Sequence, residues 1–198
     1  NAIYGIVDIK ELEPLLPIHI LWINLVTDSL PALALAFDPA NKDVMKRKPV
    51  KPGKGIFTKG MTIRIIYQGI MIGTITLIAF CIGLGTPGIE EHMRIKVGQT
   101  MAFCVLALSQ LVHVFNIRNN KESIFKTGIL NNSKLILAIV ASAALMFIIL
   151  LVEPLRNVFN IVALPIENIL EVILLVFSPI LIVEIFKLLK INTTKDEK

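Results

Sequence analysis

Three oxygen-bearing side chains, Asn24, Thr27 and Asp28, stand close together near the start of the chain. Positions i, i+3 and i+4 of an α-helix lie on one face, so a helix here would present the three side chains together. Apart from the amide nitrogen of Asn24, their donor atoms are oxygens. Hard cations such as calcium take about six to eight oxygen ligands. The pattern favours a hard-cation site over a zinc or copper site; a polar patch packed against a neighbouring helix is the alternative.

Pro31 follows these residues by one helical turn. A proline has no N–H, so it leaves the carbonyl of Thr27 without its α-helical partner. Freed carbonyls at membrane depth are tolerated where they are buried in protein or line a wet cavity. We therefore expect the helix to unwind near Pro31 and to widen the space around Asp28.

The elements that must position these residues are membrane helices. Apolar residues make up 55% of the chain and charged residues 18%, below the roughly 25% charge usual for soluble domains. A spanning helix needs about 20 predominantly apolar residues. Blocks of that length predict an all-α, polytopic membrane bundle with five transmembrane helices, at 16–37, 62–84, 97–116, 133–152 and 166–189. Asp28 then lies near the bilayer centre, where a carboxylate costs roughly 2.5–3.5 kcal/mol and marks a functional position.

Lysine and arginine residues set the orientation of these spans. They are abundant in the 38–61 loop, around 117–134 and in the tail at 191–198, and sparse at 1–15, 85–96 and 153–165. By the positive-inside rule, the N-terminal segment 1–15 lies outside and the tail is cytoplasmic. The net charge of +5 thus reflects topology, and no nucleic-acid partner is expected. The chain starts Asn1-Ala2 with no visible signal peptide, which we interpret as a tag scar or a fragment boundary after preceding helices.

The stretch 21–35, Leu-Trp-Ile-Asn-Leu-Val-Thr-Asp-Ser-Leu-Pro-Ala-Leu-Ala-Leu, followed by Phe37-Asp38-Pro39, resembles the sixth transmembrane helix of P-type calcium ATPases. The resemblance covers roughly 14–190 and continues through 100–103, 108–116, 123–125 and 154–159. It implies that 16–190 is the C-terminal membrane domain, the last five helices of a ten-helix pump. The lipid bilayer and the missing N-terminal half of the same pump are the implied partners, in a prokaryotic cell membrane.

The resemblance implies that Asn24, Thr27 and Asp28 are ligands of transported Ca²⁺, with Asp28 able to bridge two sites where two exist. Related sodium–potassium pumps carry an acidic residue where Asn24 stands, and magnesium-transporting relatives a bulkier residue in place of Thr27. Calcium is therefore implied, and manganese, which accepts similar ligands, stays open. Gln110 aligns with a glutamate ligand of two-ion calcium pumps. The neutral side chain implies one calcium per cycle, although it would equally suit a hydrogen bond to a neighbouring helix.

No Asp-Lys-Thr-Gly-Thr motif and no Walker-type phosphate loop occur in the chain, so we expect no catalytic residue here. The resemblance places ATP and Mg²⁺ in cytoplasmic domains of the parent pump. A secondary transporter or channel that couples protons or sodium through Asp28 is a competing interpretation. A scaffold is another, weakened by Asp28. His19 and His113, near the ends of their spans, are more typical of packing residues than of ligands.

Overall fold

The computed structural model describes residues 13–38, 59–118 and 132–188. Five of its helices are long and apolar enough to cross a membrane: Pro17–Leu35, Gly60–Leu84, Glu91–Arg118, Ser133–Leu151 and Ile166–Lys187. Within the described residues no strand occurs, so the prediction of an all-α bundle with five membrane helices is confirmed. The basic loop at 39–58, most of the 1–15 segment and the tail at 191–198 lie outside the described residues.

The first span consists of α1 (Pro17–Trp22), a π-helical segment η2 (Ile23–Asp28) and α2 (Ser29–Leu35). It is followed by α3 (Lys59–Leu84), α4 (Glu91–Arg118), α6 (Ser133–Leu151) and α8 (Ile166–Leu188). The helix α4 begins at Glu91, before the expected span start at 97, because residues 91–96 continue the helix beyond its apolar block. A short helix, α7 (Glu153–Phe159), lies in the segment expected to be a loop between the last two spans.

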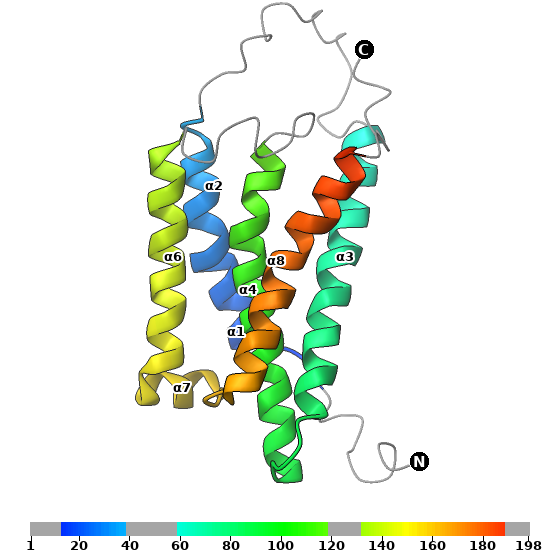
Figure 1. Cartoon of the computed structure of the whole chain (residues 1–198). Helices are drawn as coiled ribbons and strands as arrows, with labels where there is room; N and C mark the ends of the chain where they lie inside the picture. Colours follow the sequence, from blue (N-terminus) through cyan, green and yellow to red (C-terminus); the bar gives the residue numbers. More distant parts are fainter. Residues whose placement is uncertain (1–12, 39–58, 119–131, 189–198) are drawn as a thin grey trace, which may run out of the picture.

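The helix α4 is the centre of the bundle (Figure 1). Its residues 97–105 are all buried, including Met101, Phe103 and Val105 at 0% exposure. It is apolar all round its middle, as expected for a helix enclosed by other helices. Large apolar side chains such as Leu21, Ile70, Leu137 and Leu174 are exposed on the surrounding spans. Those surfaces suit a hydrocarbon solvent.

The helices α3 and α4 cross very closely near the lower end of the bundle in Figure 1. A Cβ atom added to Gly83 would lie 2.5 Å from the Cα of Gly98, well inside van der Waals contact. Small residues allow membrane helices to approach in this way. The pair of glycines therefore fixes where α3 meets the central helix.

Candidate cation site

The first span changes its helical form at the residues that carry the candidate ligands. From Ile23 to Asp28 the backbone is π-helical, with i→i+5 hydrogen bonds in place of i→i+4, and Pro31 is buried in α2 directly afterwards. Such widened turns occur mostly as single-turn insertions and are frequent at functional sites. The segment is thus widened where unwinding was expected, and it remains helical.

Hydroxyl groups cover carbonyls of the widened turn. Thr27 Oγ1 donates to the Ile23 carbonyl at 2.8 Å, and Ser29 Oγ donates to the Asn24 carbonyl at 2.8 Å. Ser142 Oγ of α6 donates to the Val26 carbonyl at 3.2 Å. Serine and threonine hydroxyls can replace backbone donors, so they satisfy the carbonyls of an irregular turn inside a membrane bundle.

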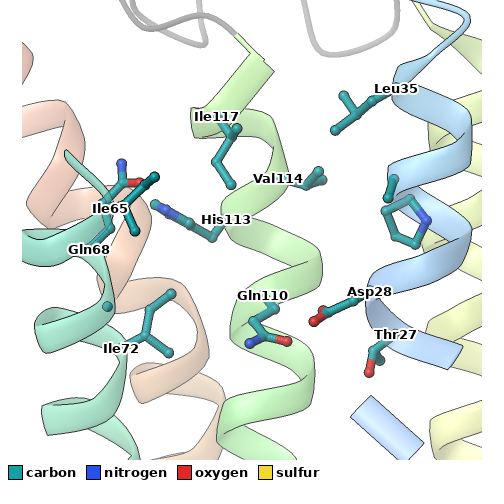
Figure 2. Close-up of a pocket in the computed structure, with 13 residues that line it drawn as sticks. Thr27, Asp28, Leu35, Ile65, Gln68, Ile72, Gln110, His113, Val114 and Ile117 are labelled. Carbon is teal, nitrogen blue, oxygen red and sulfur yellow. The ribbon is translucent and has the colours of Figure 1, made fainter. Parts of the chain in front are cut away.

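A cavity of about 360 Å³ lies beside this turn, between the first span, α3 and α4. In Figure 2 the side chains of Asp28 and Gln110 point toward one another across it, and Thr27 lies next to Asp28. The Oε1 atom of Gln110 is buried and has no hydrogen-bond partner among the described residues. An unpartnered carbonyl-type oxygen facing a carboxylate is an arrangement that a cation would satisfy.

The predicted ligands are not all brought together. Thr27 is 1% exposed and lines the cavity with Asp28 and Gln110, whereas Asn24 is exposed and does not line it. The expectation of one shared face assumed α-helical spacing, and the i→i+5 turn changes the angle between Asn24 and the other two residues. The hydroxyl oxygen of Thr27 donates its proton to Ile23, which leaves its lone pairs available to a cation.

Two polar side chains that were not proposed as ligands, Gln68 of α3 and His113 of α4, also line the cavity. The Nδ1 atom of His113 lies 3.3 Å from the amide nitrogen of Asn116, and its Nε2 atom has no partner among the described residues. In Figure 2 His113 extends toward Gln68 and Ile65, away from Asp28. No sequence signal marked Gln68, since its position in the cavity depends on how α3 packs.

The lower end of the first span is held by an aromatic cluster around His19. This side chain is fully buried; its Nδ1 accepts from the Leu16 N–H at 3.2 Å, and its Nε2 lies 2.8 Å from the Phe159 carbonyl. Because a carbonyl only accepts, Nε2 carries the proton and the ring is neutral. The ring also stacks on Phe103, with centroids 4.5 Å apart. His19 therefore packs the start of the span against α4 and α7, as a packing residue would.

An ion pair and the hydrogen bonds beside it hold the upper end of the first span. Arg118 Nε donates to both carboxylate oxygens of Asp38, at 2.8 and 2.9 Å. The amide of Asn132 donates to Asp38 at 3.0 Å and to the Ala34 carbonyl at 3.3 Å, and its oxygen caps α6 by accepting from the Leu135 N–H. The Arg118 side chain is 6% exposed, so this is a largely buried tie between the first span, α4 and α6.

The five-helix arrangement and the widened turn facing α4 define the chain as a polytopic membrane protein with a candidate cation site in its first span. Residues 12–189 match the family model described as "Cation transporting ATPase, C-terminus". The match covers most of the chain, and the chain belongs to this family.

Curated relatives agree with this assignment. The chain is 41% identical over 191 residues to "Calcium-transporting ATPase 1" of Bacillus cereus, covering 90% of the chain and 21% of that protein. It is 40% identical over 151 residues to the "Calcium-transporting ATPase" of Bacillus subtilis, covering 76% of the chain and 16% of that protein. A Listeria monocytogenes "Calcium-transporting ATPase lmo0841" is 34% identical over 152 residues, covering 77% of the chain and 16% of that protein. The chain thus spans about a fifth of the length of these relatives or less.

Proposed function

We propose that this chain is the C-terminal membrane domain of an ATP-driven calcium pump and supplies part of its calcium site. The supporting observation is the Asp28 carboxylate facing the unpartnered Oε1 of Gln110 across the cavity, with Thr27 beside it. The relatives named as calcium-transporting ATPases favour calcium as the transported ion. ATP and Mg²⁺ would act in other parts of the pump. The upper end of the bundle in Figure 1 is cytoplasmic in this proposal, and the membrane is that of a prokaryotic cell.

The site is completed by groups outside this chain. Even if the Asn24 amide, which does not line the cavity, is counted with Thr27, Gln110 and a bidentate Asp28, the chain would offer about five oxygens, short of the six to eight that calcium usually takes. The exposed amide of Asn24 lies on a part of the first span that the described helices leave open. The amide is costly to leave in lipid, so we assign that face to the preceding helices of the pump.

The first test replaces the candidate carboxylate in a complete pump that carries this membrane domain. Asp28→Asn should abolish calcium-dependent phosphorylation by ATP, because the substitution removes the negative charge that faces the cation. The measurement is the phosphoenzyme level against free calcium in purified membranes. Glu171→Gln is the matched control, since Glu171 is a carboxylate of α8 hydrogen-bonded to Asn168 at 2.9 Å, away from the cavity. Normal calcium dependence in Asp28→Asn would remove the site assignment.

The second test concerns the number of ions. Gln110 is neutral, so Asp28 is the one carboxylate among the described residues that line the cavity. We expect one calcium bound per phosphoenzyme and a Hill coefficient near one. Gln110→Glu adds the charge that a second divalent ion needs and should raise both values toward two. Equilibrium binding of calcium-45, repeated with manganese as competitor, measures this. Two ions bound by the unmodified pump would contradict the one-ion proposal.

A further inference from the structure

One carbonyl near the widened turn cannot accept a backbone hydrogen bond from residue 31, because that residue is a proline. In an α-helical ladder the N–H of residue 31 would reach the carbonyl of Thr27, and in an i→i+5 ladder it would reach that of Val26. Pro31 has no N–H, so neither bond can form. A carbonyl inside a membrane bundle must then find a donor elsewhere or remain unsatisfied.

Ser142 of α6 provides such a donor. Its Oγ atom donates to the Val26 carbonyl at 3.2 Å, and the side chain is fully buried. Among the described residues, Thr27 and Ser29 also donate hydroxyl hydrogens to carbonyls of η2, but both belong to the first span. The Ser142 bond instead joins residues 116 positions apart in sequence and comes from a different helix.

The position of this bond relates it to the cavity. Val26 directly precedes Thr27 and lies two residues before Asp28, and η2 packs against both α6 and α4. Ser142 therefore holds the turn from the α6 side while Asp28 faces Gln110 on the α4 side. A turn held from the α6 side keeps its carboxylate directed across the cavity toward α4. If the Val26 carbonyl loses the hydrogen bond from Ser142, the turn can relax and Asp28 can leave that direction.

We propose that Ser142 is a positioning residue of the cation site, whose hydroxyl holds the widened turn so that Thr27 and Asp28 face Gln110. This role rests on the proposed function, since the effect of Ser142 is measured through calcium binding. Ser142 does not touch the cation, and it acts through the Val26 carbonyl. Its loss should therefore weaken calcium binding while the chemistry of phosphorylation proceeds at saturating calcium.

The experiment compares Ser142→Ala and Ser142→Cys with the unmodified pump in phosphoenzyme formation titrated with free calcium. Ser142→Ala should raise the half-saturating calcium concentration about 3- to 10-fold, the effect of one lost hydrogen bond. The maximal phosphoenzyme level should be unchanged. Cysteine keeps a weak S–H donor in nearly the same volume, so Ser142→Cys should fall between the two. Ser178→Ala is the control, because it removes a hydroxyl bond to the Leu175 carbonyl of 2.7 Å in α8, and it should leave half-saturation unchanged.

The outcomes separate this inference from the function on which it rests. An unmodified pump without calcium-dependent phosphoenzyme overturns the proposed function and this inference together. A working pump in which both Ser142 variants keep normal half-saturation overturns the inference alone. A loss of maximal phosphoenzyme with unchanged half-saturation would assign Ser142 a folding role only and would also overturn it. The inference is supported by a raised half-saturation graded from Cys to Ala, with Ser178→Ala unaffected.

Discussion

The first span and the last span each contain a proline within the helix, and they respond to it differently. In α8, Pro179 removes the N–H that would serve the Leu175 carbonyl, and the adjacent Ser178 donates to that carbonyl at 2.7 Å. The helix stays α-helical from Ile166 to Leu188. In the first span, the turn before Pro31 widens to a π-helix, and Ser142 of another helix donates to Val26.

The two spans differ in where the donor that replaces the missing backbone hydrogen bond comes from. When a side chain of the same helix replaces the missing backbone hydrogen bond, the local geometry does not depend on neighbouring helices. A bond replaced from another helix makes the local geometry depend on tertiary packing, so that geometry can respond to a ligand. The first span also has a cavity beside its turn, lined by polar side chains. The presence of a proline therefore does not distinguish the two spans. They differ in whether the substitute hydrogen-bond donor belongs to the same helix or to another one.

The largest effect is expected when the missing backbone donors are restored. Pro31→Ala returns an N–H to the first span, so the turn should revert toward an α-helix and turn Asp28 away from Gln110. We expect the half-saturating calcium concentration to rise roughly tenfold or more, equivalent to about 1.4 kcal/mol. Pro179→Ala restores a bond that Ser178 already replaces, so it should leave half-saturation unchanged. Calcium titrations of phosphoenzyme formation measure both variants.

A double substitution tests whether Pro31 and Ser142 act on the same turn. In the Pro31→Ala background the turn reverts toward an α-helix, in which the Leu30 N–H reaches the Val26 carbonyl. Adding Ser142→Ala should then change half-saturation far less than it does alone. Such non-additivity is the expected sign of two residues that act on one structural element. If Pro31→Ala and Pro179→Ala shift half-saturation equally, the two spans respond alike and the distinction drawn between them is wrong.

A smaller effect is expected at the ion pairs near the upper ends of the two spans. Asp38 pairs with Arg118 of α4, whereas Glu184 pairs with Lys187 of its own helix at 2.9 Å. Asp38→Asn should lower the free energy of unfolding by about 1–2 kcal/mol, because it removes the negative charge from a largely buried ion pair that joins the end of the first span to α4. We also expect half-saturating calcium to rise about two- to threefold, equivalent to about 0.4–0.7 kcal/mol, since α4 carries Gln110.

Glu184→Gln is the matched control for Asp38→Asn. It breaks a pair within one helix and should leave half-saturating calcium unchanged, whatever it does to stability. Thermal unfolding in detergent gives the stability of each variant, and phosphoenzyme titration gives half-saturation. A normal calcium response in Asp38→Asn, or an equal shift in Glu184→Gln, would show that the tie to α4 does not hold the site.

The sequence was sufficient to predict the helices and pointed to the region of the candidate site, and it was insufficient for the geometry of that region. Block length and apolarity predicted the five spans, because a bilayer demands both. The motif from Asn24 to Pro31 located the turn. The α-helical period placed Asn24 on the same face as Thr27 and Asp28, whereas in the structure Asn24 is exposed and does not line the cavity. The Ser142 bond and the Asp38–Arg118 pair each join residues far apart in sequence, so they follow from helix packing that no local pattern encodes.

The crossing of Gly83 and Gly98 has a mechanical consequence for the cavity. Two backbones that touch without side chains between them resist sliding, because a shift would drive a neighbouring Cβ into the opposite chain, while rotation about the contact stays open. The crossing then acts as a pivot and α3 as a lever. Gln68 lies about 22 Å along the helix from Gly83 at 1.5 Å per residue, so a swing of about 5° would displace it by about 2 Å. Small rotations at a glycine contact distant from Asp28 would therefore change the width of the cavity beside it.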